Sequence, residues 1–255
     1  MNRTNITHVE SGAVLHSVQS QNNKPTIKEV IYYAIKESKD KAHFFTDFSN
    51  CNFEGTEIEG VSFLYCDLQS ASFKNANLKY AKFYGTIQDV NFEGANMESA
   101  FLQNVYSFEN CNFKGANLKE AIFNRALLLN CQFDPITKYE YDHLVDMLQH
   151  QGIINMEVFF TSGIFDGVNT LKELYECGTQ FCCAGLLYAK ELIKNKDKVV
   201  KVLTATKNYR LEPAEIAAWH FAPNLAYMFR MTKLGFIIEA KRRIKEYELA
   251  ATKGN

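Results

Sequence analysis

The chain has 255 residues, of which 47% are hydrophobic and 22% are charged, and its formal net charge is −1. This size and composition fit one or two ordinary globular domains, and the near-zero charge argues against nucleic acid or a membrane as the partner of the whole molecule. No apolar run reaches the roughly 18 residues that span a bilayer, and no apolar N-terminal run resembles a secretory signal. We therefore expect a cytoplasmic protein.

Residues 1–24 are polar and aperiodic, and we expect them to form a flexible N-terminus. Pro25 suits the first turn of a helix, because the N–H that proline lacks has no partner there. After it, apolar residues recur at a one-sided helical spacing, at Ile27, Val30, Ile31, Ala34 and Ile35. We expect a helix within residues 25–45 that caps the segment after it.

Residues 46–135 repeat every five positions. Each unit has a small residue, a polar residue, a large apolar residue and two mostly polar positions, as in CNFEG, ANLKY and CNFKG. Neither a helix nor a flat strand has a period of five, and self-similar units of this kind stack into a solenoid. The large central residues are Phe48, Phe53, Ile58, Phe63, Leu68, Phe73, Leu78, Phe83, Phe92, Met97, Leu102, Phe113, Leu118, Phe123, Leu128 and Phe133.

This pattern resembles the pentapeptide-repeat family, over about 90 of the 255 residues. The resemblance implies a right-handed parallel β-helix of square cross-section, with four units in each coil. In such a coil the central residue and the small residue two places before it point inward and fill a narrow core. Backbone groups pair with the neighbouring coils at about 4.8 Å.

A coil of 20 residues gives the expected prism four faces. One face carries a ladder of phenylalanines at Phe53, Phe73, Phe92, Phe113 and Phe133. The fourth face contains two breaks in register, because one residue is missing near residues 86–89 and one is extra near residues 106–109. Such irregularities often accompany functional sites, but the needs of packing can also produce them.

The outward positions divide the prism into a polar half and an apolar half. They are polar around the phenylalanine ladder and around Ile58, whereas several are apolar around Phe63 and on the fourth face. A large apolar stripe rarely stays exposed on a soluble protein, so we expect a protein partner, the chain's own helical domain or a second copy in a homodimer to cover it. The candidate residues are Leu64, Tyr65, Tyr84, Phe101, Ile122, Leu127 and Leu129.

After residue 135 the five-residue period gives way to helical periods, and we expect an all-α domain over residues 136–255. Thr137 and Glu140 have the spacing of a capping box at a helix start. The apolar positions expected on the buried side of that helix are Tyr141, Leu144, Val145 and Leu148. The fold class is therefore α+β multidomain, with an N-terminal capping helix, a right-handed parallel β-helix and an all-α domain.

Two later helices are expected, near residues 170–194 and near residues 233–250. The last one contains a basic cluster, Lys241, Arg242 and Arg243 with Lys245, which we interpret as a solvated helix face.

Four of the seven cysteines occupy the small position of the repeat, where we expect buried structural thiols. They are Cys51, Cys66, Cys111 and Cys131. The other three, Cys177, Cys182 and Cys183, lie in no recognisable nucleophile motif, and their spacing does not suit zinc. Phosphate-loop, hydrolase and metalloprotease motifs are absent from the sequence. The sequence thus predicts no catalytic residue, no metal and no cofactor, and favours a protein that is not an enzyme.

These observations favour a non-enzymatic protein-protein interaction module or scaffold, with delivery into a host cell as a bacterial effector left open. One alternative is an effector enzyme whose helical domain acts through a cysteine, because certain secreted ubiquitin ligases carry a similar β-helix before a catalytic region. Another is a DNA mimic that protects a topoisomerase, as some family members do for DNA gyrase. Those members are nearly all repeat and strongly acidic, unlike this chain.

Overall fold

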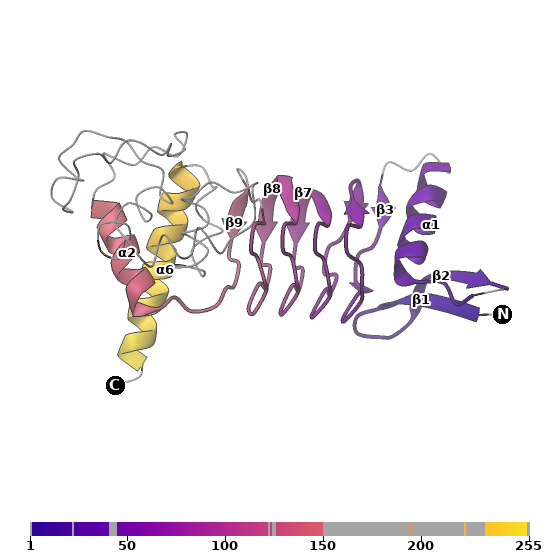
Figure 1. Ribbon diagram of the computed structural model, residues 1–255, viewed down its shortest axis with the longest axis horizontal. Helices are drawn as coiled ribbons and strands as arrows, with labels where there is room; N and C mark the ends of the chain where they lie inside the picture. Colours follow the sequence, from indigo (N-terminus) through magenta and orange to yellow (C-terminus); the bar gives the residue numbers. More distant parts are fainter. Residues whose placement is uncertain are drawn as a thin grey trace. The chain divides into compact units, whose positions relative to one another are not determined.

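The computed structural model divides into two compact units at the junction of residues 134 and 135, and each unit is treated by itself. In the described part of the chain, the first unit holds the strands and one helix, and the second holds two helices (Figure 1). Residues 170–193 of the helix expected near 170–194, and with them the cysteines at 177, 182 and 183, lie outside the described residues. The described residues are 2–21, 23–40, 45–121, 123, 126–149, 194, 222 and 233–253.

The N-terminus forms a β-hairpin, so the expectation of a flexible, aperiodic segment is wrong. β1 (Asn2–His8) pairs with β2 (Val14–Ser20) in antiparallel register. β1 also pairs on its other side with β4 (Cys51–Asn52) of the first coil. This second pairing joins residues more than 40 positions apart in the sequence, and a search for local periodicity cannot detect such a contact.

Helix α1 (Ile27–Asp40) follows the hairpin and begins with a capping box. The Thr26 N–H donates to Glu29 Oε2 at 2.6 Å, and the Glu29 N–H donates to Thr26 Oγ1 at 3.2 Å. Val30 and Ile31 are buried, and the helix contacts β1, β2 and β3 (Thr46–Asp47). The hairpin and α1 lie together at the first coil (Figure 1), where an uncapped solenoid would expose its core and its unpaired edge.

The repeat region is a β-solenoid whose coils stack in parallel register, as the sequence predicts. β3 pairs with β6 (Cys66–Asp67) on one face. A four-stranded sheet covers the neighbouring face and continues onto the face of β3 and β6, because its two long strands cross the corner between them: β5 (Ser62–Phe63), β7 (Lys82–Gln88), β8 (Phe101–Glu109) and β9 (Leu127–Leu129). Parallel bridges join successive coils on the other two faces, for example from Asn52 to Ser72 and from Glu57 to Asn77.

Stacked phenylalanines form the core of the solenoid. The ring centroids of the ladder Phe53, Phe73, Phe92, Phe113 and Phe133 are separated by 4.8, 5.5, 5.1 and 5.1 Å, and neighbouring ring planes lie within 9° of parallel. The small positions hold buried cysteines and alanines. The predicted alternation of large and small inward residues is therefore confirmed.

Most corners of the coil are four-residue turns that depend on one residue with positive φ. The Cys51 N–H, for example, donates to the Phe48 carbonyl at 3.2 Å, with Asn50 at φ 55° between them. Positive φ at this place is the mark of a type II turn, for which Gly and Asn are well suited. The described corner residues with positive φ are Asn50, Gly55, Gly60, Tyr65, Ser70, Asn75, Tyr80, Gly85, Asp89, Gly94, Ser99, Asn110, Gly115, Glu120 and Asn130.

Mutation to alanine should destabilise the solenoid to different extents at two of these glycines, Gly60 and Gly94. A Cβ at Gly60 would meet no atom within 4 Å, whereas a Cβ at Gly94 would lie 2.3 Å from Asn75 Oδ1. We expect Gly60→Ala to lower the free energy of unfolding by about 1 kcal/mol through the left-handed backbone alone, and Gly94→Ala to lower it by about 2 kcal/mol. Urea unfolding of both variants measures the difference, and equal costs would mean that the Asn75 side chain moves aside freely.

In the second unit, α2 (Lys138–Gln149) begins at the predicted capping box. The Thr137 N–H donates to Glu140 Oε2 at 2.8 Å, and the Glu140 N–H donates to Thr137 Oγ1 at 3.2 Å. α2 packs on α6 (Lys233–Lys253). Neither of these helices, nor α1, is long and apolar enough to cross a membrane.

The buried side of α2 is more polar than predicted. Glu140, His143, Leu144 and Met147 are buried, whereas the side chains expected there at 141, 145 and 148 are only half-buried. Tyr141 instead stacks on Tyr247 of α6 with centroids 4.6 Å apart.

The basic cluster of α6 is only partly a solvated face, because Lys241 and Lys245 are exposed but the two arginines are not. Arg243 is only 2% exposed, and Arg242 forms ion pairs with Glu239 and Glu246. Charged groups thus occupy the interior on both helices, and on α2 apolar spacing alone misplaces part of the buried side.

Candidate binding surface

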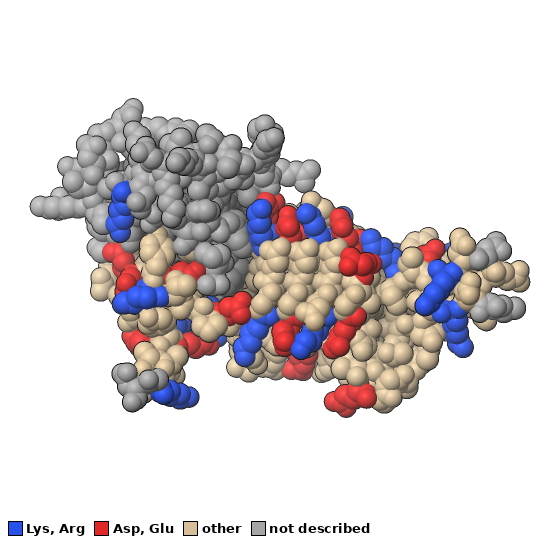
Figure 2. Space-filling view, turned by 60° about the horizontal axis from the view of Figure 1, so that its bottom comes forward, with Lys and Arg blue, Asp and Glu red and all other residues tan. Residues whose placement is uncertain are grey.

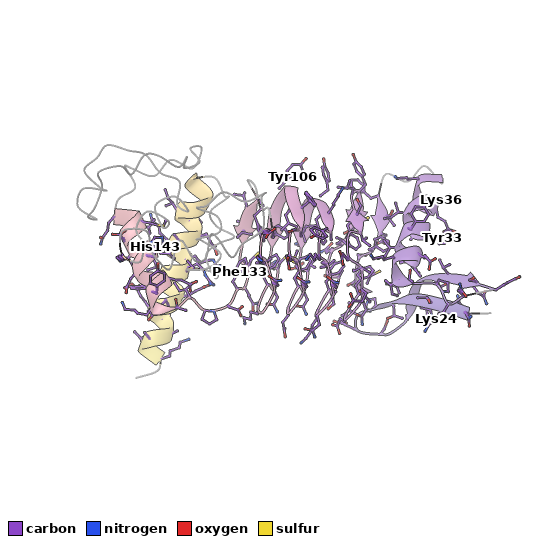
Figure 3. All side chains as sticks on the ribbon, in the orientation of Figure 1. Lys24, Tyr33, Lys36, Tyr106, Phe133 and His143 are labelled. Carbon is purple, nitrogen blue, oxygen red and sulfur yellow. The ribbon has the colours of Figure 1, made fainter. Side chains whose placement is uncertain are left out.

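Four exposed or half-exposed rings form a line across successive coils of the solenoid. They are Phe45, Tyr65, Tyr84 and Tyr106, and we call them the aromatic stripe. Their successive centroids lie 6.4, 5.5 and 5.8 Å apart, and the hydroxyls of Tyr84 and Tyr106 are 3.0 Å apart. Phe45, Tyr65 and Tyr106 are 57%, 54% and 62% exposed, and Figure 3 shows Tyr106 pointing outward from β8.

The two breaks in register build the middle of the stripe. The buried centres of the fourth face in these coils are Ile87 and Phe108. Ile87 follows Phe83 by four residues instead of five, and Phe108 follows Leu102 by six. The pairing of β7 with β8 shifts at the same corner.

Because of this shift, β7 and β8 run as long strands across a corner that other coils turn with a tight turn. Tyr84 and Tyr106 then face outward side by side, although Tyr84 directly follows the buried Phe83 and Tyr106 comes two places before the buried Phe108. The interpretation of the breaks as mere accommodation of packing therefore leaves out their effect on these two rings.

The predicted site residues divide into two groups. Tyr65, Leu127 and Leu129 are exposed, and Leu64, Tyr84 and Phe101 are half-buried. Ile122 lies outside the described residues. The structure brings Tyr65 and Tyr84 together, and it places Leu127 and Leu129 beside β8, opposite Ser107 and Glu109.

Two members of the stripe were missed from the sequence. Phe45 lies one residue before the repeat begins, and Tyr106 lies inside the break, where the five-residue register gives no inward or outward assignment. The repeat offered no signal for an outward Tyr106, because two places before a centre such as Phe108 the pattern puts a small inward residue, and in this coil Val105 is buried instead.

The two polar faces carry charges of alternating sign from one coil to the next. On the phenylalanine-ladder face, Lys74 Nζ lies 2.9 Å from Glu93, and on the Ile58 face Lys79 Nζ lies 3.0 Å from Glu98. Glu93 raises the pKa of Lys74 through this hydrogen bond and its charge, and Lys74 lowers the pKa of Glu93. Figure 2 shows rows in which acidic and basic side chains alternate along the solenoid. The rows are Glu54, Lys74, Glu93, Lys114 and Glu59, Lys79, Glu98, Lys119.

The cysteines of the solenoid are buried structural thiols, as predicted. Burial raises the pKa of Cys51 and of Cys66 to about 12, and the Cys131 thiol together with burial raises the pKa of Cys111. Among the described residues, no group of histidines, cysteines and carboxylates has the geometry to hold a metal ion.

Burial of all four solenoid thiols, with the raised pKa of Cys51, Cys66 and Cys111, predicts that they are unreactive in the folded protein. A raised pKa lowers the thiolate fraction, to roughly one part in ten thousand at pH 8 for a pKa near 12, and the thiolate is the reactive form. In a Cys177→Ser/Cys182→Ser/Cys183→Ser variant, we expect no fast reaction with a thiol reagent at pH 8, and four reactive thiols after denaturation. A native thiol that reacts as fast as free cysteine would contradict this.

Comparison with known proteins gives a family and several solved folds. Residues 51–87 and 107–134 match the family of pentapeptide repeats in eight copies. No curated protein matches the sequence.

Three solved structures show similarity to the solenoid. A pentapeptide-repeat protein of Nostoc PCC 7120, alr5209, is 19% identical over 41% of this chain and 95% of its own, with a TM-score of 0.23. HetL of the same cyanobacterium, involved in heterocyst differentiation regulation, is 20% identical over 34% of this chain and 46% of its own, with a TM-score of 0.19. The plasmid-mediated fluoroquinolone resistance protein QnrB1 is 17% identical over 40% of this chain and 65% of its own, with a TM-score of 0.17.

Proposed function

Residues 46–134 form a pentapeptide-repeat solenoid, and we propose that the protein is a non-enzymatic scaffold that binds another protein along the aromatic stripe. The observation that carries this proposal is the contrast between faces. Rings are exposed across four coils at one corner, whereas the polar faces match acids with bases. Exposed contiguous rings on a soluble protein commonly mark a binding surface.

The solenoid suits this role because it is rigid. Its backbone hydrogen bonds join every coil to the next, as from the Phe73 N–H to the Asn91 carbonyl at 2.7 Å, and its core is a continuous ladder of rings. A rigid surface loses little conformational entropy on binding. In this proposal the scaffold works in the cytoplasm, either of its own cell or of a host cell into which a bacterium delivers it.

The two alternatives have less support. The buried solenoid thiols offer no nucleophile, so a cysteine-dependent effector enzyme would depend on Cys177, Cys182 or Cys183, outside the described residues. A DNA mimic needs rows of like charge that imitate phosphates. On the two polar faces the sign alternates instead, successive lysines and glutamates neutralise each other, and acids without bases are confined to the single face of Asp47, Asp67, Asp89 and Glu109.

The test is a pull-down with Tyr84→Asp, which places a charge in the middle of the stripe. We expect the wild type to capture a specific protein from cell lysate and the variant to lose it. Tyr80→Asp is the matched control, because Tyr80 is also an exposed corner tyrosine (39%) but lies outside the stripe. It should bind like the wild type.

The same variants distinguish the other occupants of the surface. If the helical unit covers the stripe, Tyr84→Asp should speed proteolysis at the junction of residues 134 and 135. If a second copy covers it, the variant should change the size of the protein on a sizing column. If Tyr84→Asp alters none of the three readouts, the stripe is not a binding surface and the proposal fails.

A further inference from the structure

The face next to the aromatic stripe carries acids without bases. This face consists of residues 46–50, 66–70, 86–90, 106–110 and 126–130, and these five segments contain no lysine or arginine. Its acids are Asp47, Asp67, Asp89 and Glu109, one in each of four successive coils, and we call them the acidic row. The first three are exposed and Glu109 is half-buried.

Among the described residues, backbone N–H groups, a hydroxyl and an amide donate hydrogen bonds to the carboxylates of the acidic row, and His16 Nε2 lies 2.8 Å from the Asp47 carbonyl oxygen. Asp47 accepts from the Ser49 N–H at 2.9 Å and Asp67 from the Gln69 N–H at 3.0 Å. The Asn110 amide donates to Asp89, and the Ser107 hydroxyl donates to Glu109, each at 2.9 Å. The charge of Lys39 in α1 reaches this face at Cys66, but no ion pair joins that lysine to the row in the described structure.

Two members of the row face each other with the same charge. Asp47 and Asp67 are directly opposite in the register of β3 and β6, and like charges opposite one another destabilise a sheet. On the polar faces the charged neighbours stand just after each centre instead of just before it, and their signs are opposite, as for Lys74 and Glu93. A bound cation would relieve the repulsion between Asp47 and Asp67.

The stripe beside the row consists of rings that attract cations. Exposed tyrosine faces bind lysine and arginine side chains through the ring quadrupole. The same surface already shows the interaction inside the chain, because Lys82 Nζ lies 5.6 Å from the centroid of Phe101. The carboxylates nearest the stripe in sequence are Asp47 and Asp67, each two residues after a ring, whereas Glu109 and Asp89 follow Tyr106 and Tyr84 by three and five residues.

We propose that the partner of the stripe presents an extended basic segment with arginine at alternate positions, which lies along the solenoid with its guanidinium groups over the tyrosine rings and against the acidic row. This inference rests on the proposed function and names the chemistry of the partner. In an extended chain, alternate side chains lie on one side about 6.6–6.8 Å apart. The rings of Tyr65, Tyr84 and Tyr106 are 5.5 and 5.8 Å apart, so long arginine side chains reach successive rings.

Arginine fits this surface better than lysine. Its planar guanidinium stacks on a ring and at the same time presents N–H groups at its edge to a carboxylate. The lysine ammonium is a compact, strongly hydrated charge that makes weaker use of the rings. The surface therefore predicts a preference between two peptides of equal charge.

The experiment measures binding of fluorescein-labelled (Arg-Ser)5 and (Lys-Ser)5 to the full chain by fluorescence anisotropy. We expect the arginine peptide to bind at least about five-fold more tightly than the lysine peptide. Tyr84→Leu/Tyr106→Leu keeps apolar bulk but removes the rings, and should weaken binding about ten-fold. Tyr84→Phe/Tyr106→Phe keeps the rings and should stay within about two-fold of the wild type.

A charge variant tests the acidic row separately. Asp67→Asn keeps the side-chain oxygen that caps the turn at Gln69, and asparagine already fills this position in other coils. It should weaken binding about two- to three-fold at low salt. Glu59→Gln, the same change on a face of alternating sign, should leave binding unchanged.

Equal affinity for both peptides, together with normal binding by the leucine variant, would show non-specific charge attraction and overturn the inference. Failure of both peptides to bind would also overturn it. If the lysate partner is nevertheless lost with Tyr84→Asp, the proposed scaffold stands and its partner has a different chemistry. If that capture is also insensitive to Tyr84, both proposals fail.

Discussion

Replacing Phe92 by alanine should lower the free energy of unfolding of the solenoid unit by about 3–5 kcal/mol. Phe92 is fully buried and lies between Phe73 at 5.5 Å and Phe113 at 5.1 Å in the ladder. The coils above and below cannot close over the cavity, because backbone hydrogen bonds of 2.7–2.8 Å fix their separation. Because the cavity left by the ring cannot collapse, the loss of unfolding free energy should be near the upper end of the range for large-to-small core substitutions.

Equilibrium unfolding in urea, followed by circular dichroism, provides the measurement. Lys74→Ala is the control on the same face, since Lys74 is 41% exposed and forms its ion pair with Glu93 at the surface. We expect its effect to stay within about 0.5 kcal/mol. A loss below about 1 kcal/mol for Phe92→Ala would mean that the rings do not form a tightly packed column.

The solenoid was predictable from the sequence because its physics is local and repeated. A large residue every five positions, with a small one two places earlier, specifies which side chains enter the core, and Phe73 and Ala71 show the rule in one coil. Each unit repeats the evidence of the last, so that one unclear unit does not hide the pattern.

The parts that could not be predicted depend on contacts between distant residues. β1 finds its second partner in β4, and nothing within residues 1–24 records that pairing. In the second unit, Glu140 is buried through the capping box with Thr137, and Arg243 is buried on α6. Apolar periodicity treats such charged residues as surface residues.

Two of the four rings of the aromatic stripe, Tyr65 and Tyr84, could be predicted from the sequence, because the repeat is regular around them. Tyr65 and Tyr84 lie at positions where the register still assigns a direction, and the sequence identifies them as outward. Tyr106 lies where an extra residue enters the coil, and there the pattern allows either Tyr106 or Phe108 to point inward. The structure chooses Phe108, which is fully buried, and leaves Tyr106 62% exposed.

The burial of Phe108 and the exposure of Tyr106 give the second large prediction. If the register of this coil were shifted, Tyr106 would be buried and Phe108 exposed. Phe108→Ala should lower the free energy of unfolding by about 3–5 kcal/mol, since its ring packs against Phe113 at 5.3 Å and Phe123 at 5.5 Å. Tyr106→Ala should change it by no more than about 0.5 kcal/mol, since its contacts are with the exposed Tyr84 ring and hydroxyl.

Urea unfolding of the two alanine variants compares these values directly, with each serving as the control for the other. A large loss for Tyr106→Ala and a small one for Phe108→Ala would place the extra residue after Tyr106. Tyr106 would then point into the core, the line of rings would end at Tyr84, and the surface that we assign to a basic partner would lose its last ring. Unfolding of the Phe108→Ala variant thus also tests whether Tyr106 is exposed, because the place of the extra residue in the coil determines the direction of both side chains.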